Sequence, residues 1–221
     1  MKNIIVLNGS PRRNYNTAKL LKEAMRGAKS TGANVEYFDL YDYNFKGCMS
    51  CFSCQKKGST TKGLCAIKDD IRPILEKCIN SDGVIMGSPI YFSYPTGVFR
   101  CFLERLLFAT HTYMLDGKGG TKRVLDKIIP TGVIFTMNLP ENMAKDWNYP
   151  VILEENVKSL EQTMGYAESL YSYDTCQFDD FSKYNCDMFE ESQKKKVQQE
   201  QFPIDMKNAF NLGKKLAEMS L

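Results

Sequence analysis

Residues 2–21 read KNIIVLNGSPRRNYNTAKLL, and this stretch decides the fold. The apolar, β-branched run at 2–8 predicts a short strand that ends at Gly9, Ser10 and Pro11. Apolar residues at helical spacing predict a helix over 17–29. The loop between them offers backbone N–H groups, hydroxyls and guanidinium groups at the positive end of a helix. It therefore predicts a site for a terminal phosphate group.

The spacing of residues in this loop limits the class of phosphate ligand that it can bind. It contains neither GxGxxG, the dinucleotide fingerprint, nor GxxxxGK[ST], the nucleoside triphosphate loop. We therefore expect this loop to bind a monophosphate group rather than a dinucleotide or a nucleoside triphosphate. The alternative interpretation is a plain turn in which Asn16 or Thr17 caps the helix.

The rest of the chain repeats the alternation of strand and helix. Further strands are expected at 35–40, 83–87, 128–137 and 167–173, and further helices at 71–79, 96–108, 151–164 and 204–219. Strands that alternate with helices indicate an α/β three-layer sandwich, with helices on both faces of a five-stranded parallel sheet. We expect the strand order 2-1-3-4-5, with ligands at the carboxyl ends of the strands.

Composition limits the number of domains and the kinds of partner. With 221 residues, 43% hydrophobic and 25% charged, the chain is expected to form a single domain over 1–221. A cysteine-containing segment at 46–68, here called the cysteine loop, and a polar C-terminal extension from about 177 belong to it. The net charge of +3 is spread out except at Lys194, Lys195 and Lys196, which we interpret as a solvated helix face, so no nucleic-acid partner is expected.

Two features of the sequence indicate the cellular compartment of the protein. No window approaches 18 uninterrupted apolar residues, so no membrane partner is expected. The first strand begins almost at Met1, without a basic segment and cleavage site before it. We expect a cytoplasmic protein, whose eight cysteines are then thiols or ligands rather than structural disulfides.

Four of the cysteines are clustered as Cys48-x2-Cys51-x2-Cys54-x10-Cys65. Short loops of this kind let several thiolates converge on one site. The spacing leaves three alternatives open, namely a [4Fe–4S] cluster, a tetrahedral zinc ion and reduced thiols that line the ligand site. The other four are interpreted as core or incidental thiols: Cys78, Cys101, Cys176 and Cys186.

The phosphate loop resembles that of the NADPH-dependent FMN reductases and iron-sulfur flavoproteins, in the residues Gly9-Ser10-Pro11-Arg12 and Asn16-Thr17. The resemblance implies a flavodoxin-like fold with FMN as cofactor. It implies that the flavin phosphate is held by Ser10, Arg12, Asn16 and Thr17. The iron-sulfur members carry a compact cysteine pattern at the place of the cysteine loop, although with fewer residues before the last cysteine.

Two later segments extend the resemblance. Residues 87–92, GSPIYF, match the loop that faces the flavin ring in this family, which implies ring contacts from Pro89, Ile90, Tyr91 and Phe92. The alternative for this loop is a proline turn with a surface aromatic. The segment Thr136-Met137-Asn138 leaves the fourth strand at the place where the family touches the ring edge, and the resemblance implies a contact from Thr136. Residues 102–105, FLER, are similar to a family helix segment, in which we expect an ion pair between Glu104 and Arg105.

Three functions are compatible with these patterns. The first is an FMN-dependent oxidoreductase that takes electrons from NADPH or NADH and reduces a flavin, quinone or other small acceptor. The second is an iron-sulfur flavoprotein electron carrier with a [4Fe–4S] cluster and a ferredoxin-like donor. The third is a non-catalytic flavin-binding module. A homodimer or homotetramer is expected, with contacts from the aromatic-rich segments 91–94 and 178–189.

Overall fold

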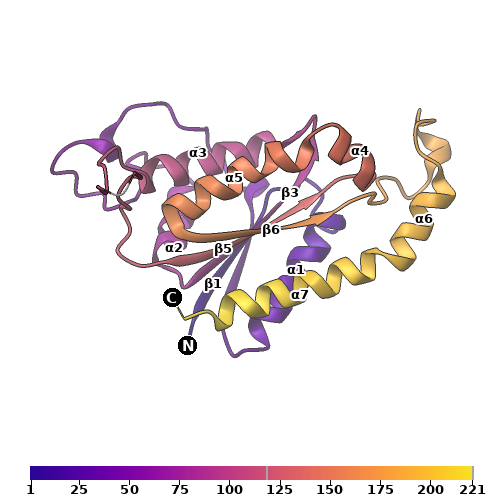
Figure 1. The fold of residues 1–221 in the computed structure, drawn as a ribbon, viewed down its shortest axis with the longest axis horizontal. Coiled ribbons are helices and arrows are strands. Elements are labelled where there is room, and N and C mark those ends of the chain that lie inside the picture. Colours follow the sequence, from indigo (N-terminus) through magenta and orange to yellow (C-terminus); the bar gives the residue numbers. More distant parts are fainter. Residues whose placement is uncertain (118, 221) are drawn as a thin grey trace.

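The computed structural model describes residues 1–117 and 119–220, and its centre is a parallel sheet between two layers of helices (Figure 1). The sheet order is β2-β1-β3-β5-β6, and all four of these pairings are parallel. The strands are β1 (Asn3–Asn8), β2 (Asn34–Asp39), β3 (Gly83–Tyr91), β5 (Ile129–Thr136) and β6 (Gly165–Ser172). The predicted fold class and order of five parallel strands are confirmed. A sixth strand, β4 (Tyr94–Pro95), pairs antiparallel with the end of β3.

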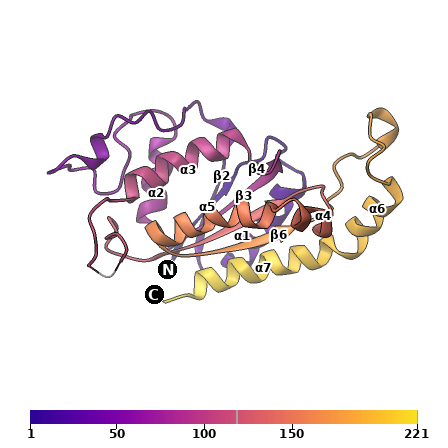
Figure 2. The same cartoon turned by 45° about the horizontal axis from the view of Figure 1, so that its top comes forward.

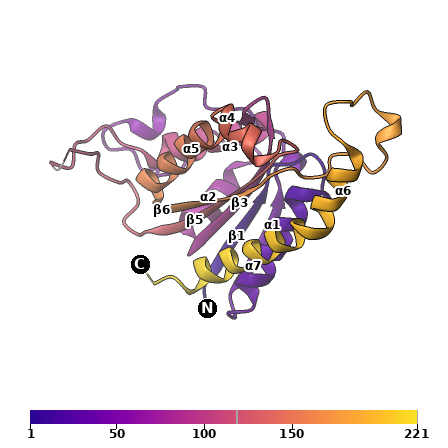
Figure 3. The same cartoon turned by 45° about the vertical axis from the view of Figure 1, so that its right-hand side comes forward.

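The helices divide between the two faces of the sheet. Helices α1 (Asn16–Lys29) and α7 (Phe202–Glu218) cover one face, and α2 (Arg72–Asn80), α3 (Gly97–Thr110) and α5 (Tyr149–Met164) cover the other (Figures 1 and 2). Helix α4 (Glu141–Asp146) was not predicted, and α6 (Glu191–Glu200) contains the three lysines that were expected on a helix face. Helix α6 lies at the end of the molecule opposite the cysteine loop (Figures 1 and 3).

The core consists of two apolar clusters, one on each side of the sheet. Alternation along β1 sends Ile4 and Val6 toward α1 and α7, and Ile5 and Leu7 toward the opposite layer. All four side chains are buried because β1 is a central strand with helices on both faces. This explains why β1 reads as a continuous apolar run rather than an alternating one.

Helices α1 and α7 pack side by side at very short range (Figure 3). A Cβ atom at Gly27 would lie 1.9 Å from the carbonyl oxygen of Phe210, and one at Gly213 would lie 1.9 Å from the carbonyl oxygen of Ala24. Only glycine permits such a close approach of two helix backbones. The helix that follows the phosphate loop is therefore fixed against the last helix of the chain.

Strand β3 extends further than predicted. Its end was expected at Gly87, but Ser88 and Pro89 continue the ladder opposite Phe135 and Thr136 of β5. The strand then turns back at Phe92 and Ser93, whose φ angles of 50° and 73° are in the left-handed region. Two successive residues of this kind make a tight hairpin whose twist suits the flanking strands.

Lys194 departs from the expected solvated helix face. Its side chain is 2% exposed, pairs with Asp174 and donates to the carbonyl oxygen of Asn138. Its Nζ also lies 4.2 Å from the ring centroid of Phe189. A buried ammonium needs such partners because desolvation would otherwise be costly. Lys195 and Lys196 are not buried.

In the part of the chain that the structure describes, no helix has both the length and the apolarity that crossing a bilayer requires.

Candidate functional site

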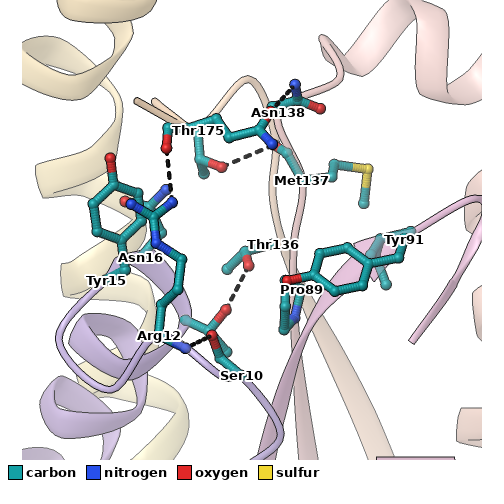
Figure 4. Close-up of a pocket in the computed structure, with 13 residues that line it drawn as sticks. Ser10, Arg12, Tyr15, Asn16, Pro89, Tyr91, Thr136, Met137, Asn138 and Thr175 are labelled. Atoms are coloured by element: carbon teal, nitrogen blue, oxygen red, sulfur yellow. Dashed lines mark hydrogen bonds between the residues drawn. The ribbon is translucent and has the colours of Figure 1, made fainter. Parts of the chain in front are cut away.

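A pocket with a cavity volume of about 140 Å³, open to solvent, lies at the carboxyl edge of the sheet (Figure 4). The strand register brings the ends of β1, β3, β5 and β6 to this edge. Loops that follow strands far apart in the sequence therefore meet around one space. The lining residues are Ser10, Arg12, Tyr15, Asn16, Thr17, Pro89, Ile90, Tyr91, Thr136, Met137, Asn138, Thr175 and Gln177.

The phosphate loop is held from beneath by a buried asparagine. The side-chain oxygen of Asn8 accepts a hydrogen bond from the Ser10 amide at 3.0 Å, and its amide group donates to the Asp39 carboxylate at 2.7 Å. The Thr96 hydroxyl donates to the carbonyl oxygen of Gly9 at 2.7 Å. A Cβ atom at Gly9 would lie 2.7 Å from the Phe99 ring. Glycine is therefore required where the loop passes over α3.

The Arg12 guanidinium lies across the pocket wall. It stacks on the ring of Tyr15, with 3.2 Å between the guanidinium carbon and the ring centroid, and donates to the carbonyl oxygen of Gln177 at 2.7 Å. Next to it, the Asn16 amide donates to the carbonyl oxygen of Cys176 at 2.8 Å. The segment after β6 thus closes the side of the pocket that carries the phosphate loop.

A pair of hydroxyls joins the start of α1, which follows the phosphate loop, to the end of β5. The Thr17 and Thr136 hydroxyl oxygens lie 2.7 Å apart, and both side chains are buried. Thr17 begins α1, whereas Thr136 ends β5. Each hydroxyl has one partner in the other, which fixes the distance between the two walls.

The third wall is the hairpin at the end of β3. Pro89 and Tyr91 face the pocket from the side opposite Arg12, and Ile90 also lines it (Figure 4). The amide of Thr96 donates to the Ser88 hydroxyl at 3.0 Å, and the same threonine bonds the phosphate loop. The hairpin and the phosphate loop are therefore fixed to each other.

Eight of the nine predicted flavin contacts line this pocket, and Phe92 does not. Its side chain is 96% exposed at the hairpin tip, because the left-handed turn directs it away. Met137 and Asn138, whose segment was expected at the ring edge, also line the pocket, and three lining residues were not expected as contacts: Tyr15, Thr175 and Gln177. Thr175 lies two residues beyond the predicted strand at 167–173, so the rule that ligands bind beyond strand ends would have found it.

The chemistry of the lining fits a flat ring with a phosphate tail. One wall offers the Arg12 guanidinium, the Ser10 and Thr17 hydroxyls and the start of α1, which suit a phosphate. The opposite wall offers Pro89 and Tyr91, whose rigid and aromatic surfaces suit a planar ring. The two requirements of FMN are thus met on opposite sides of one pocket.

A second, smaller pocket gathers the four clustered cysteines. Cys48, Cys51, Cys54 and Cys65 all line it, together with side chains from the second half of α3. The Cys65 sulfur accepts a hydrogen bond from Arg105 Nε at 2.9 Å. Within 1–117 and 119–220, no three or more histidine, cysteine, aspartate or glutamate side chains are arranged to hold a metal ion. The four thiols, as they are placed, do not form a metal centre.

Two of these thiols differ in acidity. Hydrogen bonds from the Ser53 backbone and hydroxyl lower the pKa of the exposed Cys51 thiol below its ordinary value. Burial, reinforced by the neighbouring Cys65 sulfur, raises the pKa of Cys54. Cys51 is therefore the more nucleophilic of the two at neutral pH.

The expected ion pair between Glu104 and Arg105 is wrong. Arg105, 1% exposed, instead makes a bidentate pair with Asp69 at 2.8 and 3.1 Å, and Glu104 accepts from the Cys48 amide at 3.1 Å. Arg105 also donates to the carbonyl oxygen of Lys46 at 3.1 Å. Adjacent residues on a helix point in different directions, so each of them holds a different part of the cysteine loop.

Helix α3 separates the two pockets. The hairpin that lines the first pocket leads directly into Gly97, whereas the cysteine pocket contacts Arg105, Phe108 and Ala109. At a rise of 1.5 Å per residue, the eleven steps from Gly97 to Phe108 span about 16 Å. The cysteines therefore do not line the pocket that fits FMN, contrary to the alternative that places reduced thiols there.

Two iron-sulfur flavoproteins match about half of the chain. An iron-sulfur flavoprotein from Methanocaldococcus jannaschii is 33% identical over 102 residues, which is 46% of this chain and 50% of the relative. An iron-sulfur flavoprotein from Clostridioides difficile is 37% identical over 114 residues, 48% of this chain and 49% of the relative. The chain spans about half the length of the curated relatives it matches.

Solved structures share the fold over nearly the whole chain. An NAD(P)H:quinone oxidoreductase from Methanothermobacter marburgensis superposes with a TM-score of 0.68 at 15% identity, covering 100% of this chain and 99% of the other. An azoreductase from Bacillus anthracis gives a TM-score of 0.66 at 13% identity, covering 97% and 100%. The sequence matches the NADPH-dependent FMN reductase family over residues 2–122. The chain therefore belongs to the NADPH-dependent FMN reductase family.

Proposed function

We propose that this chain is an FMN-dependent oxidoreductase that takes electrons from NADPH or NADH and reduces a flavin, quinone or other small acceptor. The observation that carries the proposal is the pocket at the carboxyl edge of the sheet, with a cationic phosphate loop on one wall and an aromatic hairpin on the other. Membership of the FMN reductase family supports it. We further propose that residues 1–221 act as one domain and work in the cytoplasm.

The roles of the lining residues follow from their chemistry. Ser10, Arg12, Asn16 and Thr17 hold the phosphate, since they supply one cation, two hydroxyls and one amide at the start of α1. The fixed φ of Pro89 keeps the ring wall stiff, while Ile90 and Tyr91 cover the ring. Thr136 positions the phosphate side through its bond to Thr17.

FMN, when bound, supplies the hydride and electron transfer itself, so the chain needs no catalytic acid or base of its own. The protein binds the cofactor, orients the ring against the hairpin and leaves one side of the pocket open. That opening gives a nicotinamide and then an acceptor access to the same ring. The segment 138–150 begins at the pocket with Asn138 and carries no motif that selects an acceptor.

An anaerobic absorption titration tests this function. Protein purified without oxygen should show flavin bands that bleach when NADPH or NADH is added, and should regain them when a quinone is added. Protein that stays colourless after incubation with FMN would overturn the proposal. Protein that binds FMN but is not reduced by either nicotinamide would instead support the third alternative, a non-catalytic flavin-binding module.

The second candidate is an iron-sulfur flavoprotein electron carrier. The observation that favours it is the convergence of Cys48, Cys51, Cys54 and Cys65 on one pocket, and relatives bear that name. A [4Fe–4S] cluster would need these thiols to move into a ligating arrangement, and a ferredoxin-like protein would then be the donor. An iron assay decides, because about four irons per chain supports the cluster and absence of iron leaves reduced thiols.

We also propose that the chain forms a homodimer or homotetramer. Aromatic and apolar side chains are exposed in both segments expected at the contact, namely Phe92 and Tyr94 on the hairpin and Tyr184 and Met188 before α6. Exposed apolar groups that cluster in this way mark interaction sites. Light scattering at micromolar concentration tests the assembly, and a monomeric mass would refute it.

A further inference from the structure

The cysteine loop carries an unusual concentration of charge. Within its 23 residues stand five lysines and no aspartate or glutamate, whereas the remaining 198 residues hold 24 basic and 26 acidic residues. The loop alone therefore contributes five positive charges, which is more than the net charge of +3 of the chain. The lysines are Lys46, Lys56, Lys57, Lys62 and Lys68, and all five are exposed.

These five lysines also lack the carboxylate partners that nine other lysines have. Nine lysines elsewhere, from Lys77 to Lys215, form ion pairs with carboxylates. In the part of the chain that the structure describes, no such pair involves a lysine of the cysteine loop. The nearest acids in the sequence are occupied, since Asp69 pairs with Arg105 and Asp70 accepts from the Asn44 amide at 3.1 Å.

The loop is a fixed platform rather than a free strand. The Gln55 side chain donates to the carbonyl oxygens of Phe108 and His111 at 2.6 and 2.9 Å, at the end of α3. Ser50 and Phe52 are held in the left-handed region, with φ angles of 53° and 55°. Such conformations persist only where surrounding contacts enforce them, and they concentrate at functional sites.

A small apolar centre accompanies the charges. Met49 is 70% exposed and Phe52 is 48% exposed, and both border the cysteine pocket. Phe52 is braced from behind by Phe108, with 5.9 Å between the ring centroids. A few exposed apolar side chains on a cationic, pre-formed loop are typical of small, transient protein–protein interfaces. In such interfaces, complementary charge guides the partner protein toward the binding surface.

We propose that the cysteine loop is a docking platform for the acidic face of a partner protein. Complementary charge identifies the occupant, because five unpaired lysines favour a surface of carboxylates. The loop has no arginine, the residue preferred for bidentate phosphate contacts in nucleic-acid readers. Met49 and Phe52 alone offer little area for insertion into a lipid surface. The platform stands apart from the FMN pocket, since α3 lies between them.

Charge reversal tests the platform on the full chain. The probe is a plant-type [2Fe–2S] ferredoxin, a small acidic protein, with binding followed by fluorescence anisotropy at about 20 mM and about 200 mM salt. Lys56→Glu/Lys57→Glu should weaken binding at least about tenfold, since repulsion replaces attraction. The matched control is Lys145→Glu/Lys158→Glu, which changes the net charge equally at lysines already paired with Glu141 and Glu155.

The expected result is binding that weakens with salt, is lost in the loop variant and persists in the control. Absence of binding at low salt, or equal loss in both variants, would overturn the proposal. Tighter binding of polyuridylate or of phosphatidylserine vesicles than of ferredoxin would also overturn it. FMN content and bleaching by NADPH are measured on the same samples. A chain that bleaches without binding ferredoxin rejects the platform alone, and one that binds ferredoxin without holding FMN rejects the proposed function alone.

Discussion

The hydroxyls of Thr17 and Thr136 are bonded to each other at 2.7 Å, although 119 positions separate them in the sequence. Thr17→Val leaves the Thr136 hydroxyl buried without a partner. We expect a loss of about 1–3 kcal/mol in the free energy of unfolding. The double variant Thr17→Val/Thr136→Val should lose less than the sum of the two single changes, because no unpaired hydroxyl remains. Urea unfolding of the four proteins measures the coupling, and strictly additive losses would contradict it.

Arg12 should distinguish FMN from riboflavin. Arg12→Ala removes the cation of the phosphate wall, so we expect FMN affinity to fall about tenfold to a hundredfold while riboflavin affinity changes little. Flavin fluorescence quenching measures both constants. Arg13→Ala is the control, since the Arg13 guanidinium pairs with Asp42 and does not line the pocket. An equal loss for both flavins would place Arg12 away from the phosphate.

Lys194 should be essential to the wall that follows β5 and β6. Lys194→Met leaves Asp174 nearly buried without its cation, and we expect the free energy of unfolding to fall by about 3–5 kcal/mol. Lys194→Met/Asp174→Asn should recover part of this loss, because no unpaired charge then remains. Urea unfolding provides the measurement. If the double variant is less stable than the single one, the ion pair is not the source of the stability.

Much of this site could be predicted because its determinants are local. The phosphate loop is one continuous segment, and Ser10, Arg12, Asn16 and Thr17 all line the pocket as expected. Strand order also followed from the alternation of apolar runs and helical spacing, because parallel strands require crossover helices.

The parts that sequence reasoning missed depend on contacts between distant segments. Nothing near Gln177 indicates that its carbonyl oxygen meets Arg12, and nothing near Lys194 indicates a carboxylate at Asp174. The partner of Arg105 was mistaken for its neighbour Glu104 for the same reason, since Asp69 lies 36 positions away. Phe92 was misplaced because a left-handed turn at a non-glycine residue has no clear sequence signal.

Cys51 should be the most reactive thiol of the cysteine loop in metal-free protein. Its pKa is lowered by hydrogen bonds from Ser53, whereas burial raises the pKa of Cys54. Limited iodoacetamide treatment followed by peptide mass spectrometry should therefore label Cys51 first. Its rate should level off at a lower pH than that of Cys54, because the thiolate is the attacking species. Cys78 is buried and serves as the unlabelled control. Faster labelling of Cys54 would contradict the assignment.

Asp205 should make stability depend on pH. Its carboxyl accepts from Ser172 at 2.5 Å and from Gln201 at 2.8 Å, yet burial raises its pKa above the ordinary value. A carboxyl with a raised pKa binds its proton more tightly in the folded state. Its contribution to stability is therefore greatest at low pH and declines as the pH rises through the shifted pKa.

Asp205→Asn removes this dependence. Relative to the unaltered chain, the variant should gain stability as the pH is raised from about 4 to about 7. Urea midpoints at several pH values provide the test. A difference between the two proteins that stays constant over this range would show that the pKa of Asp205 is not raised by folding.

The crossing of α1 and α7 at Gly27 and Gly213 has a consequence for synthesis on the ribosome. Helix α1, which completes the phosphate loop, emerges from the ribosome before four of the five parallel strands, whereas its packing partner α7 follows all five. The apolar face of α1 therefore stays without α7 while the rest of the sheet is translated, although domains generally fold as units during synthesis. The cofactor site is consequently finished only after α7 has left the exit tunnel.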